Sequence, residues 1–224
     1  MTMEVNPAIE DYVGDLARMV GQSEYPCVGA KAVLAKDKLK SLVAGDMRAA
    51  DDDQKIIDFL YGFIDTYRVS DGSLCSAAVI FQSPSHFSEA DFDRCLWTRL
   101  QAFADIDAGN FAYDLRVSSD PAARNFGFSI KSEALYVIGL HPDSSRPARR
   151  FAHPAIVFNP HAQFERLRSR GKYDSLKRAV RQRDISYAGS VNPMLADFGE
   201  SSEAIQYSGI QDGNNWKCPF ISRH

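Results

Sequence analysis

The sequence has little cysteine and little histidine. Its 224 residues include four cysteines, at positions 27, 75, 95 and 218, and five histidines. The cysteines are too few and too widely spaced for a disulfide scaffold, and no CxxC pair marks a zinc or thiol–disulfide site. This sparse use of cysteine is typical of a protein that works in a reducing compartment.

Long apolar runs are also missing. No stretch approaches the roughly 20 apolar residues that a membrane-spanning helix needs. The opening Met-Thr-Met-Glu-Val-Asn-Pro lacks the basic-then-apolar pattern of a secretory signal peptide. We therefore expect a cytoplasmic protein that has no membrane partner.

The common enzyme motifs are absent as well. The chain contains no GxGxxG after a predicted strand, no GxxxxGK[ST], no HExxH and no GxSxG. The sequence therefore shows no recognisable nucleotide, flavin or zinc site of its own. If the protein catalyses a redox reaction, its electrons come from a separate reductase.

Charge of one sign does not dominate the chain, but it is unevenly placed. The net charge is −3, from 26 basic and 29 acidic residues, so the protein as a whole offers no polycation to nucleic acid. Residues 1–140 carry 13 basic and 21 acidic groups, whereas residues 141–187 carry 11 basic and 4 acidic groups. The basic block predicts either an anion site or a surface paired to acidic neighbours.

The spacing of apolar residues along the chain predicts the fold. With 45% hydrophobic and 25% charged residues, the composition is that of an ordinary globular protein. Apolar residues at helical spacing predict helices over 7–20, 30–36, 51–67, 88–103, 161–170 and 172–184. Short apolar or alternating runs predict strands over 38–47, 77–81, 126–130, 135–140 and 155–159. The order favours a single α+β (mixed α/β) domain over 1–224, with a sheet of about five strands in mixed direction, flanked by helices and followed by an irregular tail.

Two histidines lie just after predicted strands. His141 comes after the strand 135–140, and His161 comes after the strand 155–159. Functional side chains favour strand ends that open into loops. The two imidazoles either share a cavity or face opposite sides of the sheet, and the sequence leaves both arrangements open.

Several motifs together resemble a known family. They are Tyr25-Pro-Cys27 and the stretches 139–151, 157–168, 181–184, 189–195, 202–209 and 216–220. They are similar to the YqcI/YcgG family, over nearly the whole chain and most strongly over 136–220. Within that family the sequence looks closest to the guanitoxin-pathway N-hydroxylase group.

The resemblance implies haem-dependent N-hydroxylation of a guanidine-bearing amino acid, of the arginine or cyclic-guanidine type. The implied cofactor is haem b, and the implied co-substrates are O2 and electrons from outside the chain. A guanidinium is a poor nucleophile because its charge is delocalised and its pKa lies above about 12. Its hydroxylation needs a strongly oxidised centre, which haem iron and O2 provide.

The resemblance also gives roles to individual residues. His141 is the first candidate for the axial iron ligand, with His161 second and the Cys27 thiolate as the alternative. Cys218, also beside proline, is a weaker candidate. A non-haem iron held by two histidines and a carboxylate stays open.

Charged residues complete the implied site. Arg146, Arg149 and Arg150 are candidates to grip the haem carboxylates, because arginine binds carboxylates through charge-assisted pairs of hydrogen bonds. Glu200 and Glu203 are the candidate partners of a substrate guanidinium.

Two other functions are also candidates. A haem carrier or sensor would have the same pocket and no turnover. A module that binds anions or nucleic acid through the basic block would bind no haem, and the overall acidity argues against it. A homodimer stays open.

Overall fold

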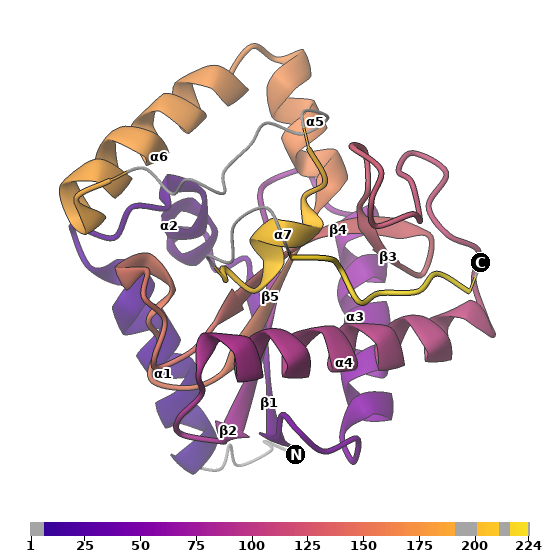
Figure 1. Cartoon of the computed structure of the whole chain (residues 1–224). Helices are drawn as coiled ribbons and strands as arrows, with labels where there is room; N and C mark the ends of the chain where they lie inside the picture. Colours follow the sequence, from indigo (N-terminus) through magenta and orange to yellow (C-terminus); the bar gives the residue numbers. More distant parts are fainter. Residues whose placement is uncertain (1–6, 191–200, 211–215, 224) are drawn as a thin grey trace, which may run out of the picture.

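The computed structural model describes residues 7–190, 201–210 and 216–223, and a five-stranded sheet lies at its centre (Figure 1). The strands are β1 (Leu39–Asp46), β2 (Ser76–Ser83), β3 (Phe128–Ile130), β4 (Glu133–Leu140) and β5 (Ala155–Pro160). Their order across the sheet is β1-β2-β5-β4-β3. Only β1 and β2 run parallel, and every other neighbouring pair is antiparallel. The predicted α+β fold with a mixed sheet is confirmed.

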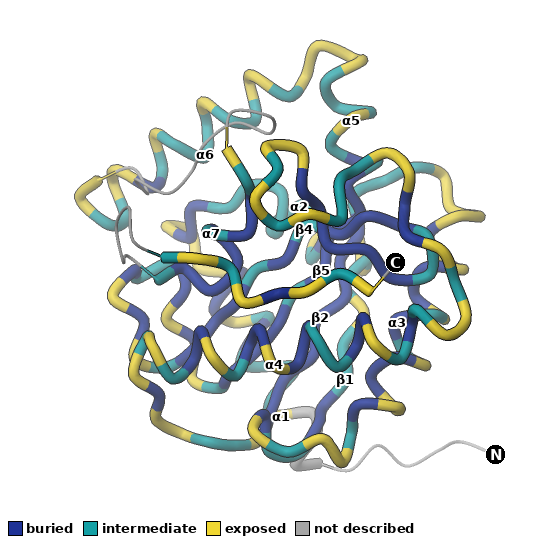
Figure 2. Tube along the Cα trace, turned by 45° about the vertical axis from the view of Figure 1, so that its right-hand side comes forward, coloured by how far each residue is buried: buried dark blue, intermediate teal, exposed yellow. Residues whose placement is uncertain are grey.

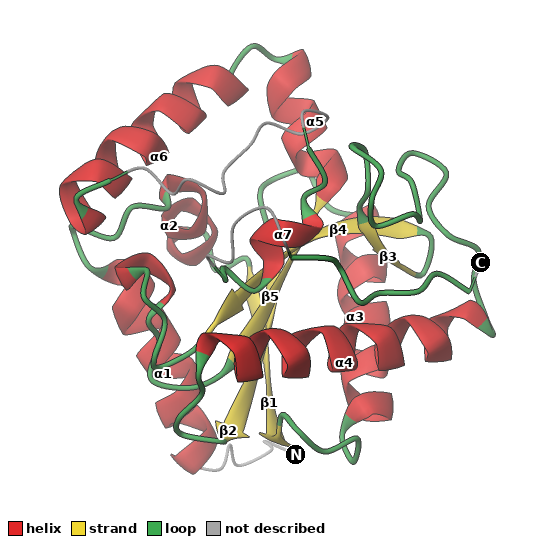
Figure 3. Cartoon of the chain, in the orientation of Figure 1, coloured by secondary structure: helices red, strands yellow, loops and turns green. Residues whose placement is uncertain are grey.

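The helices flank this sheet (Figure 3). They are α1 (Pro7–Gly21), α2 (Val28–Ala35), α3 (Asp53–Arg68), α4 (Glu89–Ala108), α5 (His161–Ser169), α6 (Tyr173–Ala188) and α7 (Ala204–Tyr207), with a 3-10 turn at Pro147–Arg149. The predicted order of elements is confirmed through α6. The four-residue α7 falls in the tail that the sequence predicts to be irregular, because one turn is too short to show a helical period.

Strand alternation divides the core into two layers. Val79, Leu135 and Val137 belong to the cluster that packs with α3 and α4. Ile80 and Leu140 belong to the cluster on the other face, with α1 and α2. Successive strand residues point to opposite faces, so a strand covered on both sides is apolar throughout. Figure 2 shows the central strands largely buried, whereas α6 is mostly intermediate or exposed.

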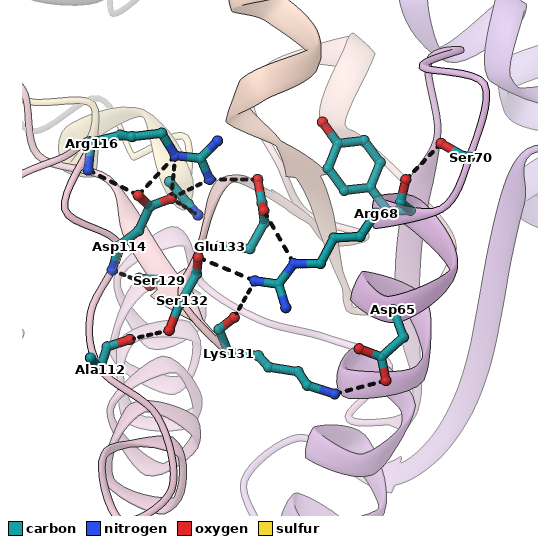
Figure 4. Close-up of polar contacts among 12 residues, drawn as sticks. Asp65, Arg68, Ser70, Ala112, Asp114, Arg116, Ser129, Lys131, Ser132 and Glu133 are labelled. Atoms are coloured by element: carbon teal, nitrogen blue, oxygen red, sulfur yellow. Dashed lines mark hydrogen bonds and ion pairs between the residues drawn. The ribbon is translucent and has the colours of Figure 1, made fainter.

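The β3–β4 hairpin turns through two residues with left-handed backbone, Lys131 (φ 51°) and Ser132 (φ 54°). Two such residues make the tight turn whose twist suits adjacent strands, although neither is glycine. Polar contacts hold the conformation: the Lys131 amide donates to the Asp107 carboxylate at 2.9 Å, and Arg68 Nη2 donates to the Lys131 carbonyl at 2.6 Å. Figure 4 shows Arg68 reaching this turn and Lys131 reaching Asp65.

An ion-pair network between two buried carboxylates and the exposed Arg116 closes the same edge of the sheet. Arg116 Nη2 lies 2.6 Å from Asp114 Oδ2 and 2.8 Å from Glu133 Oε1 (Figure 4). Both carboxylates are buried, at 4% exposure. The contacts fix the loop before β3 against the start of β4.

Within the described ranges, no helix has both the length and the apolar character needed to cross a bilayer.

Candidate functional site

A cavity of about 350 Å³ lies on the sheet face that carries Ile138 and Leu140. Residues of α1, α2, α5 and α6 also line it, together with residues of the 3-10 turn and of the segment that contains α7, and most of the lining is apolar. A largely apolar cavity of this size with a few polar groups is the usual form of a small-molecule site. The polar groups that line it therefore define the candidate site.

Cys27 lines this cavity at the N-terminus of α2. Its Sγ caps the helix and accepts a hydrogen bond from the Ala30 amide at 3.4 Å. Burial raises the pKa of the Cys27 thiol, while the backbone N–H groups of Ala30 and Gly29 oppose that shift. The thiol is thus protonated when it is alone, and the helix N-terminus favours the thiolate once a metal cation binds.

His161 and Glu203 form a buried pair in the same cavity. His161 is the first residue of α5, directly after Pro160 ends β5, and its Nε2 lies 2.9 Å from Glu203 Oε1. The two residues are only 8% and 4% exposed. The Tyr207 hydroxyl donates to the same Oε1. Burial, and then the charge of Glu203, raise the pKa of Tyr207 far above its ordinary value, so Tyr207 is a hydrogen-bond donor here.

Arg149 places a buried cation at the cavity. Its guanidinium donates to the carbonyl oxygens of Gln206 at 2.6 Å and Tyr207 at 2.9 Å. Among the described residues no carboxylate pairs with it, and burial is the main cause that lowers its pKa. A buried cation without a counter-charge is costly, so a ligand carboxylate beside Arg149 would stabilise it.

Arg146 also lines the cavity, but its charge is already neutralised. Arg146 Nη2 lies 2.7 Å from Asp184 Oδ2, and both side chains are buried. The pair joins the 3-10 turn to α6. Arg149 is therefore a better candidate than Arg146 for an anionic ligand group.

The family comparison covers all of these residues. The model of the YqcI/YcgG family matches residues 16–221 of the 224. The chain belongs to the YqcI/YcgG family. Searches of curated proteins and of solved structures returned no match.

In this YqcI/YcgG protein, His141 faces away from the cavity. Alternation along β4 puts Leu140 on the cavity face and the next residue on the α4 face, where the His141 ring stacks on Phe92 with centroids 4.4 Å apart. His141 is 1% exposed and does not line the cavity. Of the two arrangements that the sequence leaves open, a shared cavity does not hold: His161 lines the cavity and His141 does not.

Two further sequence candidates do not join the cavity either. Arg150 is exposed, and its Nε donates to the Ser144 carbonyl at 3.0 Å. Arg150 does not line this cavity, and its role at a cofactor carboxylate stays a prediction. Cys218 packs against the α3 and α4 core layer instead. Glu200 lies outside the described residues.

The sequence does not single out Tyr136 and Gln206. Both line the cavity, and the Tyr136 hydroxyl donates to Gln206 Oε1 at 2.6 Å. Alternation along β4 places Tyr136 on the same face as Ile138 and Leu140, so the strand pattern holds the signal for Tyr136. Nothing in the pattern marks Gln206, whose position depends on the docking of α7 on β4.

Residues of the basic block line the cavity. Arg168 of α5 and Lys177 and Arg181 of α6 line it, in addition to Arg146 and Arg149. Part of the predicted anion-binding block therefore surrounds the candidate site. In the ranges that the structure describes, no group of three or more His, Cys, Asp or Glu side chains is arranged to hold a metal ion.

Proposed function

We propose that this YqcI/YcgG protein is a haem-dependent monooxygenase that N-hydroxylates a guanidine-bearing amino acid. The observation that carries the proposal is the lining of one apolar cavity by three groups: a helix-capping thiol, Cys27, a buried cation that no described carboxylate neutralises, Arg149, and a buried carboxylate, Glu203. Cys27 suits the role of iron ligand. Arg149 suits the binding of a cofactor carboxylate, and Glu203 suits the binding of a substrate guanidinium. The substrate class comes from the resemblance to the guanitoxin-pathway N-hydroxylase group.

The donor set fits a haem. The porphyrin supplies four nitrogen ligands, so the protein needs to supply only one axial ligand. A single Cys27 thiolate meets that need without a cluster of protein ligands. The apolar walls suit the macrocycle, and Arg149 suits one of its carboxylates by a charge-assisted bond.

Cys27 is a better iron ligand than either histidine. His141 faces α4, and Nε2 of His161 is bonded to Glu203. The N–H groups that point at Cys27 Sγ stabilise a thiolate and orient it, as partners of a metal ligand do. When bound, a thiolate-ligated haem activates O2 with electrons from a separate reductase.

Glu203 is the residue that recognises the guanidinium. The bonds from His161 and Tyr207 both end on Oε1, and Oε2 accepts no bond from a described residue. A desolvated carboxylate oxygen binds a guanidinium through short charge-assisted hydrogen bonds. The contact with His161 fixes the orientation of this carboxylate inside the cavity.

Two measurements on one preparation test the proposal. The protein is produced with haem precursor, and its absorption spectrum is recorded. It is then incubated with arginine or a cyclic-guanidine amino acid, ¹⁸O2 and a reductase system, and the product is analysed by mass spectrometry. One ¹⁸O atom on a guanidine nitrogen supports the proposal. A protein that binds no haem overturns it, and one that binds haem without labelling either substrate is a carrier or sensor.

A further inference from the structure

We infer that Tyr136, Tyr207, Trp97 and Trp216 form a one-electron conduit between the cavity and the protein surface. This inference rests on the proposed function, because it requires that a strong one-electron oxidant arises in the cavity. It adds a function that turnover itself does not need: the removal of oxidising equivalents that find no substrate.

The four rings form an unbroken series. Tyr136 lines the cavity, and its ring centroid is 5.9 Å from that of Tyr207. Tyr207 stacks on Trp97 at 5.5 Å with an interplanar angle of 17°, and Trp97 lies 5.9 Å from Trp216. Each step is within the range of direct aromatic contact. The rings come from β4, α7, α4 and the C-terminal segment, so the series passes from one core layer to the outside.

The two ends of the series differ in exposure. Tyr207 is fully buried and Trp97 is 2% exposed, whereas Trp216 is partly exposed. A reductant in solution therefore reaches Trp216 without entering the cavity.

Carboxylates accept hydrogen bonds from two of the four rings, Tyr207 and Trp216. The Tyr207 hydroxyl donates to Glu203, so a carboxylate stands ready to take the proton when Tyr207 loses an electron. Trp216 Nε1 donates to Asp93 Oδ2 at 3.1 Å, which places a negative charge beside the outer indole.

Trp97, in the middle, has no such partner. Its Nε1 is buried and bonds to nothing in the described structure. An unbonded buried N–H costs free energy that a phenylalanine at this position would avoid. Packing alone therefore does not explain an indole here, whereas a relay that is oxidised and reduced without moving a proton does.

The electron and proton balance is simple. An oxidant in the cavity takes one electron from Tyr207 across Tyr136, and the hydroxyl proton passes to Glu203 Oε1. Trp97 reduces the Tyr207 radical, whose proton returns, and Trp216 then reduces oxidised Trp97. A one-electron reductant such as ascorbate restores Trp216. In sum, one electron moves from solution to the cavity, and no bond between heavy atoms forms or breaks.

The redox chemistry of the side chains determines when the conduit operates. Phenol and indole groups lose an electron only to a strong oxidant, so they do not carry electrons from a low-potential reductase. The conduit therefore operates when an oxidant persists in the cavity without substrate.

Pulse radiolysis of the haem-free protein tests the conduit independently of the cofactor. Azide radicals oxidise tryptophan selectively, and Trp97 and Trp216 are the two tryptophans of the chain. This starts the transfer between Trp97 and Tyr207 in the opposite direction, through the same ring contact. In the wild type we expect the tryptophanyl absorption to decay as tyrosyl absorption rises, with a first-order rate that does not depend on protein concentration. Trp97→Phe should slow this step at least tenfold, because it separates Trp216 from Tyr207.

Three further variants make the result specific. Tyr207→Phe should suppress the tyrosyl product, and Trp216→Phe should lower its yield because Trp97 is shielded from the radical. Tyr12→Phe, in α1 and outside the series, should behave as wild type. A wild-type rate in Trp97→Phe, or no intramolecular phase at all, overturns the inference even if haem binding and hydroxylation are found. If the variants behave as expected but the protein never binds haem, the proposed haem-dependent function is overturned instead.

Discussion

The imidazole of His141 stacks on the ring of Phe92, with centroids 4.4 Å apart and planes 23° apart. His141 is 1% exposed, and its Nδ1 has no hydrogen-bond partner in the described structure. Burial is the main cause that lowers the pKa of His141 below its ordinary value near 6.5. His141 is thus a neutral core residue whose protonation opposes folding.

Replacing His141 with phenylalanine should reduce the sensitivity of the protein to acid. Because the folded pKa is below the unfolded one, the unfolded chain binds a proton that the folded chain does not, and stability falls as pH drops below about 6.5. This residue contributes a slope of at most about 1.4 kcal/mol per pH unit. Urea unfolding at pH 7, 6 and 5 should show a shallower slope in His141→Phe. An unchanged slope would contradict this account, and His86→Phe, at an exposed site, is the control.

The position of His141 shows how far the sequence predicts the site. The continuous apolar run predicts the strand 135–140 to within a few residues of β4. A continuous run is apolar on both faces, however, so it does not tell which face carries the cavity. That depends on which helices cover which face, and a shift of one residue reverses the answer.

The rest of the site depends on contacts between distant parts of the chain. His161 and Glu203 are 42 positions apart, and Cys27 lies far from both in sequence, at the start of α2. Each is a candidate by residue type, and no local pattern joins them. The short α7, which brings Gln206 and Tyr207 to β4, has no period that the sequence could reveal.

Replacing Arg149 with glutamine should destabilise the fold by roughly 3 kcal/mol, because hydrogen bonds from a buried charged group are lost. The bonds tie the 3-10 turn to the carbonyl oxygens of Gln206 and Tyr207. Arg150→Gln, one position along and exposed, should cost less than about 1 kcal/mol. Equilibrium urea unfolding of both variants measures the difference, and equal effects would show that Arg149 is not a structural link.

Replacing Gly139 with alanine should cost about 1–3 kcal/mol through overpacking. A Cβ at Gly139 would stand 2.5 Å from Phe92 Cε1 and 2.7 Å from Leu96 Cδ1. Gly62, within α3, has nothing within 4 Å of the same added atom. Gly62→Ala is therefore the matched control and should be neutral or stabilising, since alanine favours a helix. Thermal unfolding should give a lower Tm than wild type for Gly139→Ala and not for Gly62→Ala.

Replacing Glu203 with glutamine should remove the negative charge of the side chain while keeping its size and shape, so it tests how much the charge contributes to substrate binding. The amide oxygen of the new side chain can still accept bonds from His161 and Tyr207, so the cavity keeps its form. The lost negative charge should weaken binding of a guanidinium substrate by about a hundredfold, as expected when one member of a desolvated ion pair is removed. Spectral titration of the haem-loaded protein with arginine gives the Kd, and citrulline, a neutral isostere, is the control ligand. Equal losses for both ligands would point to a structural effect instead.

Replacing Cys27 with serine should remove the iron ligand without removing the helix cap. Serine is one of the preferred N-cap residues, because its side-chain oxygen accepts a hydrogen bond from a backbone N–H group. The stability of α2 should therefore be kept. The thiolate is lost, however, and the ferrous–CO complex should lose the long-wavelength band that thiolate ligation gives. Cys95→Ser, on α4 and outside the cavity, should keep that band. If Cys27→Ser retains the wild-type spectrum and haem content, the ligand is instead His161, the remaining candidate in the cavity, and His161→Ala should then abolish haem binding.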